Sequence, residues 1–94
     1  MALKVHVSGH LRGYAMGALD MEVERAKDVL ALVVALDKKF PGFKDRLLDE
    51  HDRTRIYINI FVNQDNARDL HGEATKLNDG DVIYILPSVA GGMR

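Results

Sequence analysis

The hydrophobic positions along this 94-residue chain follow two different periods, and each period predicts one kind of element. In residues 3–8 (LKVHVS), apolar and polar residues alternate, which is typical of a strand with one buried face. Residues 18–23 are expected to form a second strand. Over residues 24–40 the apolar residues recur at helical spacing, and Pro41-Gly42 should end that helix.

The second half of the chain is expected to contain further strands. Residues 42–55 are polar and should form a wide loop with at most a short helical turn. The next segment is β-branched and aromatic, which favours a strand. After it, the turn residues NQDNA suggest that residues 67–71 pair back as a short strand, and residues 82–87 should form the last strand. The residues expected on the buried face of the aromatic strand are Ile56, Ile58, Ile60 and Val62.

The predicted order is therefore β-β-α-β-β-β, with one main helix packed across one face of a mixed sheet. This arrangement defines an α+β fold class. Residues 1–87 are expected to form the folded domain, and residues 88–94 a flexible C-terminal tail.

Composition excludes several classes of function. The net charge is −1 and the basic residues are scattered, so nucleic acid is not an expected partner. The longest apolar run has eight residues, far fewer than the ~20 that span a bilayer, so no membrane association is expected. The chain has no cysteine and no secretory signal pattern, which favours a cytoplasmic protein.

Candidate catalytic and metal sites are weak. His6 and His10 are four residues apart in a segment that reads as strand and loop, and a metal pair at that spacing requires a helix. Surface or strand-pairing histidines are the simpler interpretation, so no metal and no bound cofactor are expected. No phosphate-binding glycine motif or nucleophile motif is present either. We therefore do not expect the chain to be an enzyme on its own.

Aromatic residues near the end of the chain suggest a docking surface. If their strands are neighbours, Tyr57, Phe61, Tyr84 and Leu86 share the face of the sheet away from the helix. An apolar patch of this size is typical of a protein interface. The alternative is that the loop 42–55 folds over the patch.

The chain ends in ILPSVAGGMR, which combines a strand end with a slender tail. Residues 88–92 are small and uncharged, and they reach roughly 17 Å when extended. Because glycine lacks Cβ, its backbone enters narrow channels that larger residues block. Such a tail can place a terminal carboxylate in another protein's active site, although frayed ends have a similar composition.

Taken together, these features resemble the ubiquitin-like sulfur carriers of the MoaD/ThiS family, and most closely the branch that serves cysteine biosynthesis. The resemblance spans the chain and is most specific at NDGDVIYILPSVAGG; Leu11-Arg12 is a lesser match. It implies a β-grasp fold. It also implies that an ATP-using enzyme of the ubiquitin-activating type adenylates the C-terminal glycine, which then becomes a thiocarboxylate that donates sulfur to a biosynthetic enzyme.

The resemblance also implies roles for particular residues. Gly92 would be activated, with Gly91 threading beside it. Phe61, Tyr84 and Leu86, together with Tyr57 and Arg12, are the candidate partner contacts. Met93-Arg94 departs from the family pattern, because these residues hold the Gly92 carbonyl in a peptide bond. We therefore expect cleavage between Gly92 and Met93, by a zinc-dependent protease of the JAMM type.

Three other functions stay open on the sequence. The chain could be the small subunit of a molybdopterin synthase, which predicts a tight heterocomplex. It could be a noncovalent ubiquitin-like binding module, which predicts that the tail is dispensable. It could also tag proteins through Gly92, which predicts lysine-linked adducts.

Overall fold

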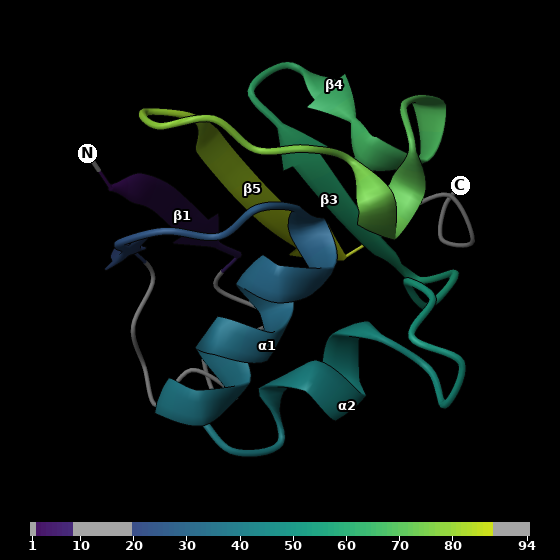
Figure 1. Ribbon diagram of the computed structural model, residues 1–94. Coiled ribbons are helices and arrows are strands. Elements are labelled where there is room, and N and C mark those ends of the chain that lie inside the picture. Colours follow the sequence, from purple (N-terminus) through teal and green to yellow (C-terminus); the bar gives the residue numbers. More distant parts are fainter. Residues whose placement is uncertain (1, 9–19, 88–94) are drawn as a thin grey trace.

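The structure is a computed structural model that describes residues 2–8 and 20–87 (Figure 1). A five-stranded sheet forms one layer, and the helices lie across one of its faces. The predicted α+β class, with a mixed sheet and one main helix, is confirmed. The elements in chain order are β1 (Leu3–Val7), β2 (Asp20–Val23), α1 (Val29–Lys39), α2 (Phe43–Leu47), β3 (Ile58–Val62), β4 (Asp65–Asn66), the 3-10 helices η2 (Ala67–Asp69) and η3 (Gly72–Ala74), and β5 (Val82–Pro87).

The last strand of the chain lies at the centre of the sheet, whose order is β2-β1-β5-β3-β4. Strand β5 runs parallel to β1 and antiparallel to β3, so the sheet is mixed. Ile83 and Ile85 of β5 are both 0% exposed and face the helices. The strand that precedes the C-terminal tail is therefore the central strand of the sheet.

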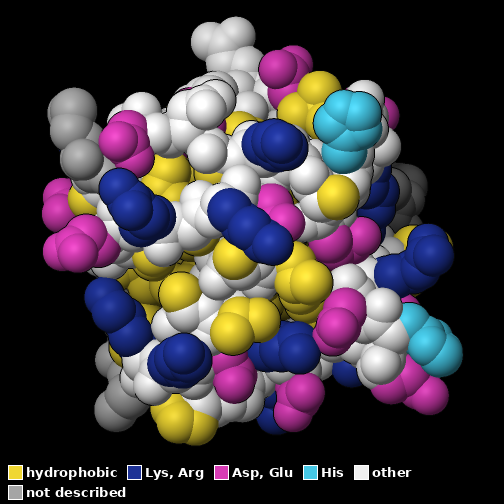
Figure 2. All heavy atoms as spheres, in the orientation of Figure 1, with side chains coloured by type: hydrophobic (Ala, Val, Ile, Leu, Met, Phe, Trp, Pro, Cys, Tyr) yellow, Lys and Arg dark blue, Asp and Glu magenta, His cyan; other side chains and the backbone are white. Residues whose placement is uncertain are grey.

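The core lies between the sheet and helix α1. Val29, Val33 and Leu36, three of the positions that gave the helical period, are fully buried, as predicted. The helix-covered side of the molecule carries positive and negative side chains interspersed (Figure 2). No strongly basic region is visible on that side, in keeping with the scattered basic residues of the sequence.

Helix α1 begins at Val29 and not at Glu24, where the periodicity begins. Asp28 is its N-cap, and the carboxylate of this residue accepts a backbone hydrogen bond from the first helical turn at 2.8 Å. The preceding residues pair with another part of the chain. The carbonyl of Lys27 accepts a hydrogen bond from the backbone N–H of Leu77 at 3.1 Å, which draws this segment out of the helix.

The segment 42–55 contributes to the core, although its polar composition predicted a loop. A short helical turn was expected there, and α2 provides it, but Phe43 and Leu47 are 0% exposed. Gly42 turns the chain at a φ of +96°, a conformation that favours glycine. The carboxylate of Asp37 then accepts two backbone N–H groups around the start of α2, at 3.1 and 3.0 Å. Because α2 packs beside α1, it does not cover the opposite face of the sheet.

The prediction that Ile56 lies on the buried face is wrong, because this side chain is 86% exposed. Strand β3 begins only at Ile58. The backbone N–H of Ile58 donates to the carbonyl of Arg55 at 2.9 Å, which closes a turn over residues 55–58. This turn interrupts the alternation on which the prediction depended.

The predicted strand over residues 67–71 is also wrong. In the segment that follows β3, Asp65–Asn66 pair with β3, but Ala67–Asp69 form a 3-10 turn. The side chain of Asn66 accepts the backbone N–H of Arg68 at 3.0 Å, and this local hydrogen bond starts the turn in place of a longer strand.

Candidate docking face and tail attachment site

The face of the sheet opposite the helices, called the open face below, gathers the outward side chains of β5 and β3. In both strands these side chains alternate with buried ones. The register places Phe61 beside Tyr84 and Asn59 beside Leu86. The structure therefore brings together Phe61, Tyr84 and Leu86, three of the predicted contact residues, and Tyr84 is 39% exposed.

His6 extends this face across β1, a contribution that the sequence did not reveal. It lies beside Tyr84 in the parallel pairing of β1 with β5, and the two rings stack with centroids 5.1 Å apart. On its other side, His6 Nδ1 contacts the carboxylate of Asp20 in β2. Asp20, His6, Tyr84 and Phe61 thus form one row across four strands. The alternation of the first strand did place His6 outward, but the neighbour of that strand was not known.

The attachment point of the tail is held on both sides. Pro87 is the last described residue, and its partner in β3 is Ile58. On the β1 side, the backbone N–H of Ser8 donates to the carbonyl of Ile85 at 3.0 Å. The tail therefore starts from a fixed position at the end of the central strand. The predicted site residues that lie outside the described part of the chain are Arg12, Gly91, Gly92 and Met93.

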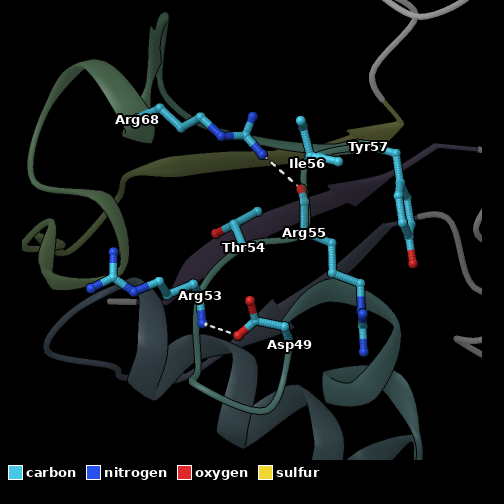
Figure 3. Close-up of a pocket in the computed structure, with 7 residues that line it drawn as sticks. All are labelled: Asp49, Arg53, Thr54, Arg55, Ile56, Tyr57 and Arg68. Atoms are coloured by element: carbon cyan, nitrogen blue, oxygen red, sulfur yellow. Dashed lines mark hydrogen bonds between the residues drawn. The ribbon is translucent and has the colours of Figure 1, made fainter.

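Tyr57 lies apart from the row on the open face. It belongs to the turn that precedes β3 and is 55% exposed. Ile56 and Tyr57 extend from this turn in different directions (Figure 3). Because Ile58, at the start of β3, pairs with Pro87, at the end of β5, the turn lies at the end of these strands where the tail begins.

Three arginines, Arg53, Arg55 and Arg68, are among the residues that line a shallow depression beside this turn, and their side chains extend in different directions (Figure 3). Arg68 is fixed by two hydrogen bonds, from Nη1 to Asn59 Oδ1 at 2.5 Å and from Nη2 to the carbonyl of Arg55 at 2.7 Å. Arg55 in turn donates through Nε to a backbone carbonyl of α2 at 2.8 Å. We call Arg53, Arg55, Ile56, Tyr57 and Arg68 the arginine surface. The sequence did not indicate it, because Arg53 and Arg55 stand among acidic residues there.

The acidic residue of this depression is already engaged. The backbone N–H groups of Arg53 and His51 donate to Asp49 Oδ1 at 3.1 and 2.8 Å, and they hold the pKa of Asp49 below its usual value. Asp49 thus stabilises the loop that precedes the turn. Because its Oδ1 already accepts two backbone hydrogen bonds, less of this carboxylate is available to the nearby arginines.

A second carboxylate anchors the same loop from η3. Glu73 Oε2 accepts both the backbone N–H and the hydroxyl of Thr54, at 2.6 and 2.7 Å. Partial burial raises the pKa of Glu73, but the two Thr54 hydrogen bonds and the charge of Arg53 outweigh it, so the pKa lies below its ordinary 4.5. The loop that presents Ile56 is therefore tied to the body of the domain.

Thr54→Val should reduce stability in a pH-dependent way. Because the folded-state pKa of Glu73 is depressed, the carboxylate stabilises the fold above pH 4.5, and this contribution is lost as the pH falls through the folded value. We expect a loss of about 0.5–1 kcal/mol near neutral pH, at the low end because solvent screens the pair. Urea unfolding at neutral pH and at about pH 3 measures it, and the loss should shrink at acid pH. An equal loss at both pH values would contradict the anchoring role of the carboxylate.

Neither a metal site nor a membrane span emerges from the described residues. Within 2–8 and 20–87, no three His, Cys, Asp or Glu side chains are grouped to hold a metal ion. In the same residues, no helix combines the length and the apolar character needed to cross a bilayer.

The strand order, with β5 between β1 and β3 and the main helix across the sheet, is that of the ubiquitin-like β-grasp fold. One chain of the crystal structure of the Amycolatopsis orientalis BexX/CysO complex superposes with a TM-score of 0.88 at 32% identity, covering 97% of this chain and 100% of that one. The predicted fold is confirmed.

The sequence defines the family. Residues 5–92 match the ThiS family. The sulfur carrier protein CysO of Mycobacterium tuberculosis is 34% identical over 95 residues, which cover 98% of this chain and all of CysO. A putative sulfur carrier protein of Archaeoglobus fulgidus is 32% identical over 94 residues, again covering 98% of this chain and all of the relative. The chain belongs to the ThiS family, as the residues of its last strand and tail predicted.

Proposed function

We propose that this chain is a sulfur carrier protein that serves the biosynthesis of cysteine or of a related sulfur metabolite. Removal of Met93-Arg94 exposes the carboxylate of Gly92, which is the group that carries sulfur. The chain is a co-substrate of other enzymes and not a catalyst, and it works in the cytoplasm. The chain ending in Arg94 is in this view a precursor.

The chemistry takes place at the Gly92 carboxylate in two steps. A carboxylate oxygen first attacks the α-phosphorus of ATP in the activating enzyme and displaces pyrophosphate, which gives an acyl-adenylate. Hydrosulfide then attacks the carbonyl carbon, the bond to AMP breaks, and a thiocarboxylate remains. Since the chain has no cysteine, it cannot carry the sulfur on a cysteine thiol. The C-terminal carboxylate is then the group that carries it.

The observation that carries this proposal is the point at which the family similarity ends. It runs as far as Gly92 and leaves out Met93-Arg94. The fold supports it as well, because Pro87 ends the central strand, and the pairing of that strand with β1 and β3 fixes the start of the tail. Five residues such as 88–92 would reach roughly 17 Å if fully extended, enough to cross a narrow channel into an active site.

Three partners follow from this function. A ubiquitin-activating-type enzyme adenylates the tail, a zinc-dependent protease of the JAMM type removes the two-residue extension, and a biosynthetic enzyme accepts the sulfur. The A. orientalis CysO that resembles this chain forms a complex with BexX, which supports a function through partner proteins. We propose that Phe61, Tyr84 and Leu86 of the open face contact these partners, with Tyr57 and Arg12 as further contacts.

The decisive experiment follows the sulfur on the tail. The chain ending at Gly92 is incubated with ATP, sulfide and the adenylating enzyme of its own organism, and its intact mass is measured. We expect one oxygen to be replaced by sulfur, and fragmentation after alkylation should locate the label on Gly92. A chain truncated after Ala90 is the matched control, because it retains every described residue and lacks both glycines.

The same material distinguishes the other functions. A sulfurised chain that remains in a stable heterocomplex with a larger synthase would favour the molybdopterin synthase subunit. Full biological activity of the chain truncated after Ala90 would favour a noncovalent binding module and would refute the carrier. Lysine-linked adducts of Gly92 in cell lysate would show protein tagging.

A further inference from the structure

The turn before β3 exposes an apolar side chain to an unusual degree. At 86%, Ile56 is the most exposed large hydrophobic residue among those the structure describes. The adjacent Tyr57 is 55% exposed. Single exposed apolar residues are common on protein surfaces, so exposure alone implies nothing. Two further features suggest a function for Ile56: it lies close to the start of the tail, and arginines lie near it.

The position of the turn relates it to the tail. Ile58 closes the turn through its hydrogen bond to Arg55 and also pairs with Pro87, the last described residue before the tail. A protein that encloses residues 88–92 in a channel must therefore have the mouth of that channel at this end of the strands. The mouth of the channel then lies against the arginine surface, whereas the row centred on Tyr84 lies further along the sheet.

The charge of the arginine surface is positive in a chain whose net charge is −1. Three arginines line the depression together with Asp49, whose Oδ1 already accepts two backbone hydrogen bonds, and Arg53 also interacts with the charge of Glu73. Arg68 is held by its own two hydrogen bonds, so it loses little side-chain freedom on binding. Guanidinium groups are well suited to bind carboxylates on a partner.

A nucleotide is a poor fit for these arginines. The residues between Pro87 and the activated terminus span roughly 17 Å when extended, so the phosphates of ATP lie at the far end of the tail. A protein surface at the near end of the tail is the occupant that this geometry allows.

We propose that the arginine surface is the docking site for the channel mouth of the adenylating enzyme, with an apolar pocket for Ile56 and acidic side chains opposite Arg53, Arg55 and Arg68. This inference rests on the proposed function and adds a contact surface to it, separate from the open face. The enzyme binds the domain through this surface, beside the start of the tail, while it adenylates Gly92 at the end of the tail.

The test is ATP–pyrophosphate exchange by the adenylating enzyme, measured against the concentration of the chain ending at Gly92. Ile56→Ser should raise the KM for the carrier about tenfold, as expected for an anchor residue in an interface. The kcat should be unchanged, because the tail itself is intact. Val34→Ser on α1 is the matched control, since Val34 is 36% exposed on the helix-covered side, and its KM should equal that of the unsubstituted chain.

A second variant tests the charge. Arg53→Gln removes a cation but keeps the backbone hydrogen bond to Asp49, and the KM should then rise less steeply with added salt. Lys38→Gln, at the end of α1, removes the same charge elsewhere and should keep the full salt dependence.

The outcomes separate this inference from the proposed function. Absence of exchange with the unsubstituted chain ending at Gly92 would refute the carrier function, and the docking site with it. Normal exchange with an unchanged KM for Ile56→Ser would overturn the docking site alone. An unchanged KM together with loss of a homodimer would assign the surface to self-association and would also overturn it.

Discussion

ATP–pyrophosphate exchange should stay at background for the chain ending in Arg94 and should reach full activity for the chain ending at Gly92. In the longer chain the Gly92 carbonyl belongs to a planar amide, which has no anionic oxygen to attack phosphorus. The Met93 side chain is a further obstacle in a channel shaped for glycine. The measurement uses purified chains of both lengths with the adenylating enzyme and labelled pyrophosphate.

A chain ending at Met93 is the informative control for this switch. Like the chain ending in Arg94, it ends in a free carboxylate, but this carboxylate lies one residue beyond Gly92 and on a bulky residue, so the chain tests whether the terminal residue must be slender. We expect it to be inactive, because Met93 brings a Cβ and a long side chain to the reacting position. Exchange by the chain ending in Arg94, at the rate of the chain ending at Gly92, would contradict the role of Met93-Arg94 as a removable cover.

The tail shows what local sequence can and cannot establish. Small residues followed by Gly91-Gly92 are compatible with a frayed end, and only their combination with the last strand pointed to a carrier. The structure adds the position of Pro87 at the end of the central strand. That position depends on the pairing of β5 with β1 and β3, which joins residues far apart along the chain and leaves no local signal.

The strands and the main helix could be predicted because burial on one face gives each a regular period. The errors lie where a local hydrogen bond interrupts that period. The side chain of Asp28 delays the start of α1, and the side chain of Asn66 replaces an expected strand with a 3-10 turn. Helix α2 is a different case. Its apolar residues Phe43 and Leu47 are four apart, a helical spacing, but three charged residues between them hid the signal.

The candidate site was predictable only in part, for the same reason. Phe61, Tyr84 and Leu86 could be placed on one face from the alternation of two strands. His6 could not be joined to them, because its stacking on Tyr84 requires the parallel pairing of the first and last strands. In the arginine surface, Arg68 of η2 contacts the turn over residues 55–58. No sequence spacing indicates that these two segments are neighbours, so this surface could not be predicted.

Ile58→Ala should destabilise the domain severely, whereas Ile56→Ala should leave its stability almost unchanged. Both residues had been predicted to lie on the same buried face, but Ile58 is 1% exposed and Ile56 is 86% exposed. Removing a buried isoleucine side chain leaves a cavity and costs about 2–5 kcal/mol. Domains are typically stable by roughly 5–15 kcal/mol, so this loss is a large fraction of the total. An exposed substitution stays within about 0.5 kcal/mol.

Urea unfolding followed by circular dichroism compares the two variants with the parent chain. The midpoint should fall strongly for Ile58→Ala at an unchanged slope, because the surface exposed on unfolding is nearly the same. Since Ile58 also pairs with Pro87, the loss should loosen the attachment of the tail, and hydrogen exchange at the Ile85 amide should accelerate. Equal destabilisation by both substitutions would mean that Ile56 packs into the core in solution. It would then be unavailable to a partner, and the docking role of the arginine surface would fail with it.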